Sequence, residues 1–159
     1  MTDARFEDGA ERPLNLVAQD AEDLAVISAL AQDAVFTGAH MVRDRKARTF
    51  ALLLNRFRWE DRAAAEAARR PYERVRAVLM IADVRAVRTL GLPRHRADTV
   101  LSLLSIGWTA GEDGMGTLTL TLAGDGAIAV DVETLEVSLR DVTRPYRAPS
   151  GKAPGHPEG

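Results

Sequence analysis

Polar and apolar residues alternate strictly along TLTLTL, from Thr117 to Leu122. In an extended chain, this two-residue period places Leu118, Leu120 and Leu122 on one face and the threonines on the other. The segment AGDG that follows supplies the glycine and aspartate residues that tight turns favour, and IAV then resumes an apolar strand. The sequence therefore predicts a β-hairpin here, with its leucine face turned towards a core.

The same two-residue period returns in several other segments. It begins at Val35 with VFTGAHMV, and the polar connection RDRKAR leads into the strand FALLLNRF. Further strand-like segments are VRAVLMI, VRAVRTL and TVLSLLSIGW. The repeated VRAV is too short to be a structural repeat, so it indicates two consecutive strands or one bulged strand. We expect about seven strands in all.

Two segments at the ends of this strand region carry helix signals. Asp20, followed by Asp23, is a favourable N-cap, and the apolar spacing after it predicts a helix from Ala21 to Gln32. Asp131 is a similar cap for a final helix from Val132 to Val142. Between the strands, EDRAAAEAARR has strong helix formers but no apolar stripe, which indicates an exposed helical excursion or a loop.

This order of elements predicts an α+β fold. About seven mainly antiparallel strands would form a pleckstrin-homology-like barrel or sandwich, with one helix before them and one C-terminal capping helix. The likeness is an analogy of element counts, and a fold does not by itself imply a function. Residues 1–13 and the Pro- and Gly-rich residues 143–159 are expected to be disordered, which leaves a single globular domain at 14–142.

Composition limits the compartment and the available chemistry. No apolar run approaches the roughly 18 residues that a membrane-spanning helix needs, and the acidic start MTDARFEDGAERP lacks the features of a secretory signal. We expect a soluble cytoplasmic protein without a membrane span. Cysteine is absent, which removes disulfides, thiolate nucleophiles and cysteine metal sites.

Charge is segregated along the chain, although the net charge is only −2. Residues 1–33 carry a net charge of −6, residues 34–100 of +8, residues 101–142 of −6 and the remaining tail of +2. A basic middle third of this kind can form a face for an acidic protein, nucleic acid or lipid headgroups. Alternatively, folding brings the acidic and basic segments together so that their fields cancel.

The segment FALLLNRFRWED, from Phe50 to Asp61, changes from apolar to alternating arginine and aromatic residues. One face would carry Ala51, Leu53, Asn55, Phe57 and Trp59. We take this face as the core face, so Asn55 is either a structural amide or a contact in a ligand pocket. The arginines fall on the opposite face from the aromatic residues, which argues against a base-stacking platform for nucleic acid. The candidate partner-binding residues are Arg43, Arg45, Lys46, Arg56 and Arg58.

Catalytic and metal-binding motifs do not emerge from the sequence. His40, His95 and His156 lack metal-ligand spacing, and no serine lies in a G-x-S-x-G elbow. The glycines of GEDGMG and AGDG lie between predicted strands, which favours hairpin turns over a phosphate-binding loop. Asp131 is interpreted as a helix cap, and the neighbouring glutamates are interpreted as solvated. We therefore predict no catalytic residues, no metal and no cofactor.

Five segments resemble an uncharacterised bacterial family, the domain of unknown function 2948. They are LVAQDAEDLAVISALAQDAV, FALLLNRFRWE, DVRAVRTLGL, VLSLLSI and GAIAVDVETLEVSLRD. The resemblance extends over roughly Leu14 to Asp141 in the same order. It implies a compact single domain with no established activity, and residues 61–70 are where members would differ most.

These observations favour a non-enzymatic binding or protein-interaction module with an acidic protein partner. A nucleic-acid-binding protein that uses the basic middle third is the alternative, and an unrecognised hydrolase is the third hypothesis.

Overall fold

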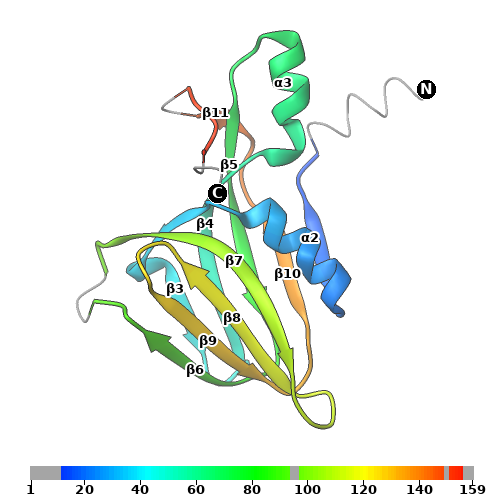
Figure 1. Cartoon of the computed structure of the whole chain (residues 1–159), viewed down its shortest axis with the longest axis vertical. Coiled ribbons are helices and arrows are strands. Elements are labelled where there is room, and N and C mark those ends of the chain that lie inside the picture. The colour runs from blue at the N-terminus through cyan, green and yellow to red at the C-terminus, as the bar shows by residue number, and fades with distance from the viewer. Residues whose placement is uncertain (1–11, 94–96, 149–150, 156–159) are drawn as a thin grey trace.

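The computed structural model describes residues 12–93, 97–148 and 151–155, which form an α+β fold (Figure 1). Its helices are α2 (Ala21–Ala31) and α3 (Arg62–Ala68), and the short 3-10 helices η1 and η2 span Gly38–His40 and Trp59–Asp61. The strands are β1 (Asn15–Ala18), β2 (Val35–Thr37), β3 (Met41–Asp44), β4 (Thr49–Phe57), β5 (Glu73–Ile81), β6 (Val84–Leu90), β7 (Val100–Ala110), β8 (Gly116–Leu122), β9 (Ala127–Val132), β10 (Val137–Asp141) and β11 (Tyr146–Arg147).

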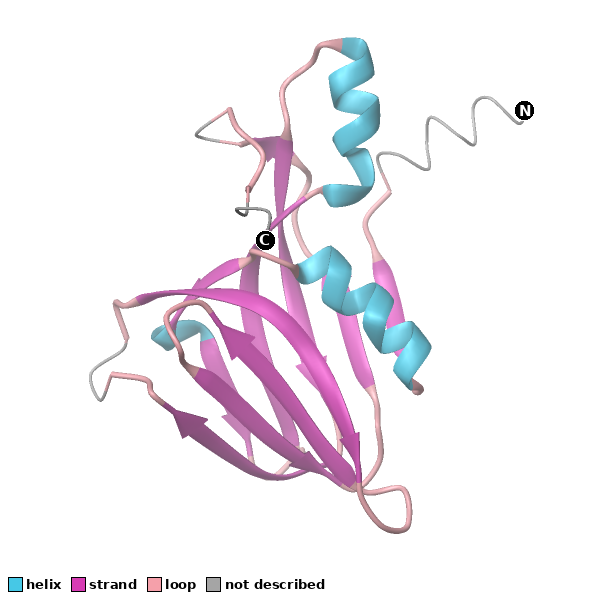
Figure 2. Ribbon diagram, viewed as in Figure 1, coloured by secondary structure: helices cyan, strands magenta, loops and turns pink. Residues whose placement is uncertain are grey.

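One large antiparallel sheet contains all eleven strands. Their order is β1-β10-β5-β4-β2-β7-β8-β9-β6, with β3 paired to β4 and β11 paired to β5. The sheet curves strongly, so that β7, β8 and β9 lie in front of β4 and β5 in Figure 2. The sheet is open, with β1 and β6 at its two ends, so the expected pleckstrin-homology-like barrel is not confirmed and the count of about seven strands was too low.

The core lies inside the curve of the sheet. Leu118, Leu120 and Leu122 of the predicted hairpin are all buried there, which confirms the inward leucine face. Their alternation with threonine is what allows one side of β8 to face the core while the other side faces water. Leu79 of β5 and Leu139 of β10 belong to the same cluster, so the two halves of the sheet share one core.

Helix α2 covers the core beside β7 and β1 (Figure 1). The predicted cap is present, because the Asp20 carboxylate accepts a hydrogen bond from the Asp23 amide at 2.8 Å. Leu24 and Ile27, spaced at helical intervals, are buried against the sheet. The sequence-predicted helix is therefore confirmed, to within one residue at its end.

The predicted C-terminal capping helix is wrong. Residues 127–132 and 137–141 form β9 and β10 instead, and Asp131 lies within β9 rather than at a helix cap. Strand β10 lies between β1 and β5, and both neighbours supply backbone partners along its length. Its burial alternates with a period of two, which matches a strand with one face in the core. Two flanking strands thus outweigh the helical spacing of the leucines.

The two copies of VRAV belong to two consecutive strands, β5 and β6, which was one of the two predicted alternatives. Asp83 lies in the turn between them and adopts a left-handed φ of 55°. The excursion EDRAAAEAARR contains α3, which projects beyond the end of β4 at the top of Figure 1.

The structure describes two residues of the predicted N-terminal segment and a larger part of the predicted C-terminal tail. The predicted disordered N-terminal segment, 1–13, lies outside the described residues except for residues 12 and 13. Within the predicted tail, Tyr146 and Arg147 form β11 against β5, and Ala148 is buried. Among the described residues, no helix has the length and apolar character needed to span a membrane.

Candidate functional site

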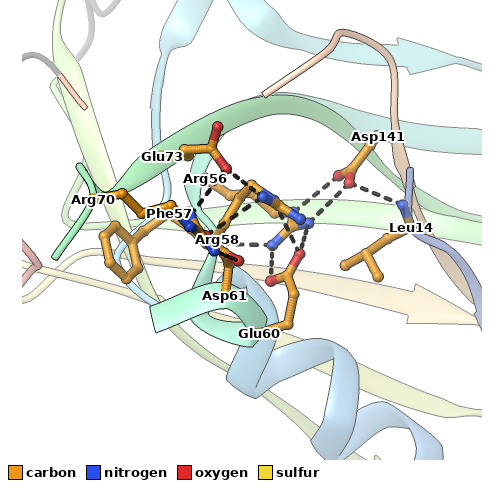
Figure 3. Close-up of polar contacts among 9 residues, drawn as sticks. All are labelled: Leu14, Arg56, Phe57, Arg58, Glu60, Asp61, Arg70, Glu73 and Asp141. Atoms are coloured by element: carbon orange, nitrogen blue, oxygen red, sulfur yellow. Dashed lines mark hydrogen bonds and ion pairs between the residues drawn. The ribbon is translucent and has the colours of Figure 1, made fainter. Parts of the chain in front are cut away.

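Arg56, near the end of β4, is the centre of a buried polar cluster (Figure 3). Its side chain has no exposed surface. The guanidinium binds Asp141 of β10 in a bidentate manner, with Nε to Oδ1 and Nη2 to Oδ2 both at 2.9 Å. Such paired hydrogen bonds between guanidinium and carboxylate are strong and geometrically specific.

Glu60 completes the surroundings of the Arg56 guanidinium. Arg56 Nη1 and Nη2 donate to Oε1 and Oε2 of Glu60 at 2.9 and 2.8 Å, and Nη1 also donates to the Phe57 carbonyl at 3.3 Å. Together with the two bonds to Asp141, these five bonds use all five N–H donors of the arginine. Asp141 Oδ2 additionally accepts a hydrogen bond from the Leu14 amide at 2.9 Å, which ties the chain before β1 to the cluster.

A second group of ion pairs lies beside the first and holds the base of α3. Arg58 is 4% exposed and its Nη1 donates to Glu73 Oε1 of β5 at 2.5 Å. Arg70, which follows α3, makes two bonds of 2.6 Å to the carboxylate of Asp61. The two groups together bring three arginines and four carboxylates into contact, and Figure 3 shows them at the junction of η2, β4 and β5.

The electrostatics of this polar cluster favour the ionised state of its members. Burial opposes the charged form of Arg56, but the hydrogen bonds that it donates to Glu60 and Asp141, and the negative charge of these carboxylates, outweigh burial and raise the pKa of Arg56. Burial likewise opposes ionisation of Glu60, yet the bonds from Arg56 leave its pKa below the ordinary value. The hydrogen bonds from Arg70 lower the pKa of Asp61. The ion pairs of the cluster therefore fasten β4 to β10 and hold the base of α3, with one carboxylate more than the number of arginines.

The predicted partner-binding residues do not form one stripe. Arg56 and Arg58 are buried in the polar cluster, because the arginine face of β4 is the core face. Arg45 and Lys46 are exposed in the turn between β3 and β4, and Arg43 donates to the Arg85 carbonyl at 3.3 Å. Arg56 lies eight residues along the chain from Arg48, the last residue of that turn, which is roughly 26 Å along an extended strand.

Asn55 lies on the outer face of β4, so the predicted assignment of core and outer faces was reversed. Phe50, Leu52 and Leu54 alternate inward, while Asn55 is half-buried on the other side. It lines a pocket of about 160 Å³ between β2 and β4, which we call the β2–β4 pocket. Asn55 thus lies at a pocket, on the face opposite to the expected one, and its contact with a ligand stays a prediction.

The outer face of β1, β10, β5, β4 and β3 carries residues that the sequence reasoning did not single out. The strand register aligns residues there in three rows that run across the strands, and the third row continues onto β2 and β7. We call the residues of these three rows the outer face. The first row is Val17, Ser138, Met80, Ala51 and Val42; the second is Asn15, Arg140, Val78 and Leu53; the third is Arg76, Asn55, Val35 and Ser102.

Arg76 and Arg140 are the charged residues of these thirteen. Both are exposed, and neither guanidinium bonds to any residue within the described part of the chain. Val17, Val42 and Met80 expose 54%, 57% and 38% of their surface. The alternation within VRAVLM could have revealed Arg76, because the buried Val75 and Ala77 flank it; nothing local to the sequence marks Arg140.

Among the described residues, no group of three or more His, Asp or Glu side chains is arranged so that it could hold a metal ion. His40 lies at the β2–β4 pocket with its Nδ1 3.3 Å from Thr37 Oγ1. His95 and His156 lie outside the described residues.

Comparison with known proteins gives one match. A family model described as "Protein of unknown function (DUF2948)" matches residues 14–156. No curated protein and no solved structure matches the chain.

Proposed function

The chain belongs to the DUF2948 family of proteins of unknown function, and within that family we propose that it is a cytoplasmic, non-enzymatic interaction module that binds an acidic protein partner on its outer face. The observation that carries this proposal is the composition of the outer face: it carries Arg76 and Arg140 together with the exposed Val17, Val42 and Met80, and its three rows contain no carboxylate.

Unpaired arginine among aliphatic side chains is a typical composition for a protein interface. Protein interfaces are enriched in arginine and methionine, and contiguous exposed apolar patches on soluble domains often mark binding sites. The carboxylates of the polar cluster already pair with arginines inside the domain, so the free positive charge of the outer face favours an acidic partner.

Nucleic acid is the alternative partner for a basic surface. Sheets that bind single strands use exposed aromatic side chains on which bases stack. The three rows of the outer face contain no aromatic residue, and Phe57 of β4 is buried against Trp59 and Tyr72. This composition supports a protein partner over nucleic acid. The hydrolase hypothesis has less support, because no carboxylate of a described residue bonds to the His40 ring beside Thr37.

The analogy with pleckstrin-homology-like barrels adds no residue to this surface. It placed the partner site in loops such as RDRKAR, which contains Arg45 and Lys46. These two exposed cations therefore serve as the matched control for the outer face, because they provide two positive charges at a different place on the same domain.

The experiment compares three immobilised proteins in a cell lysate: the wild type, Arg76→Glu with Arg140→Glu, and Arg45→Glu with Lys46→Glu. The protein retained by the wild type is purified, and its affinity for all three is measured by calorimetry. We expect the outer-face variant to lose at least about tenfold in affinity and the turn variant to keep it. Equal binding to all three proteins would refute the outer face as the interface.

A gel-shift assay with mixed RNA and DNA tests nucleic acid as the alternative partner. Phosphate contacts predict affinity that falls steeply with salt concentration. Retardation at low salt that disappears in the outer-face variant would support nucleic acid as the partner. Absence of retardation at low salt supports the acidic protein.

A further inference from the structure

The β2–β4 pocket exists because β2 and β4 separate after a single pair of residues. Val35 pairs with Asn55, but β2 then continues along β7, with Thr37 opposite Val100. The next neighbour of β4 on this side is β3, whose first pair is Met41 with Leu52. Leu53 and Leu54 lie between these two pairings and have register partners in β5 alone. The sheet is therefore split at this point of the outer face.

The pocket has an aliphatic wall and a polar rim. Val35, Leu53 and Val100 line it, and Val100 is 69% exposed. Thr37, His40, Asn55 and Arg76 provide its polar groups. Arg76 supplies a positive charge to the lining, which contains no carboxylate.

Asn55 and Arg76 offer hydrogen-bond donors to a ligand in the pocket. Arg74 Nη1 already donates to Asn55 Oδ1 at 3.3 Å and to the Asn55 carbonyl at 3.2 Å, so the Asn55 amide is left with its Nδ2 donors. Arg76 has donors only. Thr37 and His40 can donate or accept, so they fit either kind of ligand group. The charge of Arg76 therefore decides the preference, and it favours an anionic acceptor such as a carboxylate.

Size restricts the ligand further. Pockets for cofactors and drug-sized ligands typically enclose about 300–1,000 Å³. A volume of about 160 Å³ corresponds to one branched aliphatic side chain with a small polar group. The pocket thus suits a carboxylate and an aliphatic group that are held close together.

We propose that the β2–β4 pocket binds the aliphatic C-terminal residue of the acidic partner, with its α-carboxylate at Arg76 and Asn55 and its side chain against Val35, Leu53 and Val100. This inference rests on the proposed function, because it names the part of the partner that the outer face recognises. A C-terminal residue carries both groups on one Cα. In an extended acidic segment, by contrast, a carboxylate and a neighbouring aliphatic side chain point to opposite sides of the strand.

The first test uses small probes and needs no partner. Amide signals of the labelled full-length protein are followed by NMR during titration with N-acetyl-leucine, N-acetyl-leucinamide, N-acetylglycine and isovalerate. We expect saturable shifts at Thr37, Leu53 and Asn55 with N-acetyl-leucine. The amide lacks the charge and N-acetylglycine lacks the side chain, so both should bind at least about tenfold more weakly. Equal binding of the acid and its amide would overturn the proposal.

Matched variants locate the contact. Arg76→Gln should weaken N-acetyl-leucine about tenfold. Arg140→Gln should leave it unchanged, since Arg140 lies on the same face but outside the pocket lining. A loss in both variants would point to general attraction by the face and would refute the pocket. If isovalerate binds as tightly as N-acetyl-leucine, the occupant of the pocket is a free short-chain acid and not a C-terminal residue.

The second test separates this inference from the proposed function. The retained partner is compared with a form whose C-terminal residue is amidated or removed. Loss of affinity with the amidated form supports the inference. If the amidated form binds with unchanged affinity while Arg140→Glu still weakens binding of the partner, the pocket is refuted and the interaction module is retained. If N-acetyl-leucine binds but no partner is found whose binding depends on the outer face, both the interaction module and the C-terminal residue as the occupant are refuted.

Discussion

Arg56 illustrates how one residue acquires its role from its surroundings. It is the largest of the fully buried side chains, and its guanidinium is neutralised by Asp141 and Glu60 at distances of 2.8–2.9 Å. A buried charge is costly unless it is paired and its donors are satisfied. Because all five donors are used, Arg56 contributes to the union of β4 and β10 and has none left for a partner.

Asp141→Asn tests this role. The substitution keeps the shape of the side chain but removes the charge and places an amide donor beside the guanidinium. We expect a loss of about 1–3 kcal/mol in the free energy of unfolding, measured by chemical denaturation, because two buried donors of Arg56 lose their charged acceptor while Glu60 still neutralises the guanidinium.

The control for Asp141→Asn is Glu133→Gln. Glu133 pairs with Arg48 at 2.6 Å, but both side chains are about half exposed, at 50% and 45%. A surface pair of this kind contributes at most about 1 kcal/mol. Similar losses for the two substitutions would contradict the special role of the buried pair.

At the scale of elements, the hairpin of β7 and β8 depends on a close approach of Trp108 to Gly116. A Cβ atom added at Gly116 would lie 2.5 Å from the Thr109 carbonyl oxygen, and the Trp108 ring would be closer still. The ring therefore occupies the space that any larger residue would need. Gly107, in the same hairpin, has nothing within 4 Å of an added Cβ.

These two glycines form a matched pair of test positions. Gly116→Ala should destabilise the protein by about 1–3 kcal/mol through overpacking and should alter the fluorescence of Trp108. Gly107→Ala should be neutral or slightly stabilising, because glycine costs conformational entropy in a strand. Thermal unfolding of both variants distinguishes the outcomes, and an equal effect of the two would rule out the close approach as the cause.

Helix α3 is a second element whose position depends on a few contacts. It has seven residues, which is too short for stability by itself, and it is held at its base by Asp61 with Arg70 and by Arg58 with Glu73. Its burial is limited to Ala65. The ion pairs therefore contribute much of what keeps α3 in place beside η2.

Asp61→Asn should release α3 without unfolding the sheet. Asp61 is buried and receives both Arg70 bonds, so its neutralisation weakens the fastening at one point. Hydrogen exchange should become faster by at least about tenfold at the amides of residues 62–70 and should stay unchanged at β8 and β9. Uniform acceleration across the chain would show instead that α3 and the sheet open together.

For the whole molecule, the polar cluster couples stability to pH. Glu60 and Asp61 have pKa values below their ordinary values of 4.5 and 3.8, so the folded state binds fewer protons than the unfolded chain. Their contribution is complete above the unfolded pKa values and is lost as the pH falls through the lower, folded ones. Arg56 stays protonated throughout, because its pKa is raised.

We therefore expect the free energy of unfolding to decline from about pH 5 downward. Glu60→Gln should flatten this decline, as measured by urea denaturation between pH 2 and pH 6 in a series of buffers at about equal ionic strength. Glu112→Gln, in an exposed turn, serves as the control and should leave the profile unchanged. A wild-type profile that is flat over this range would contradict the contribution of the cluster.

The open sheet also leaves one of its two faces available as a binding surface. Its inner face and α2 enclose the core, while the outer face of β1, β10, β5, β4 and β3 has no described element packed over its exposed valines. The proposed partner would cover this face, and the split between β2 and β4 gives it one recessed point of attachment.

The amino-acid sequence by itself determined the local elements whose signals are repeated over several residues. The period of two in TLTLTL, the cap and apolar spacing of α2, and the turn between β8 and β9 all depend on near neighbours in the chain, and the structure has them as predicted. The family membership likewise follows from the sequence, since the family model spans residues 14–156.

Only the tertiary structure decided which face of β4 is buried and what becomes of residues 132–142. Alternation shows that a strand has two different faces, but partners in other strands determine which one is inside. Arg56 is buried because Asp141 lies beside it, 85 residues further along the chain, and Leu139 lies in a strand because β1 and β5 flank it. The meeting of Arg76, Arg140 and the β2–β4 pocket on one face depends in the same way on strand register, which no local pattern specifies.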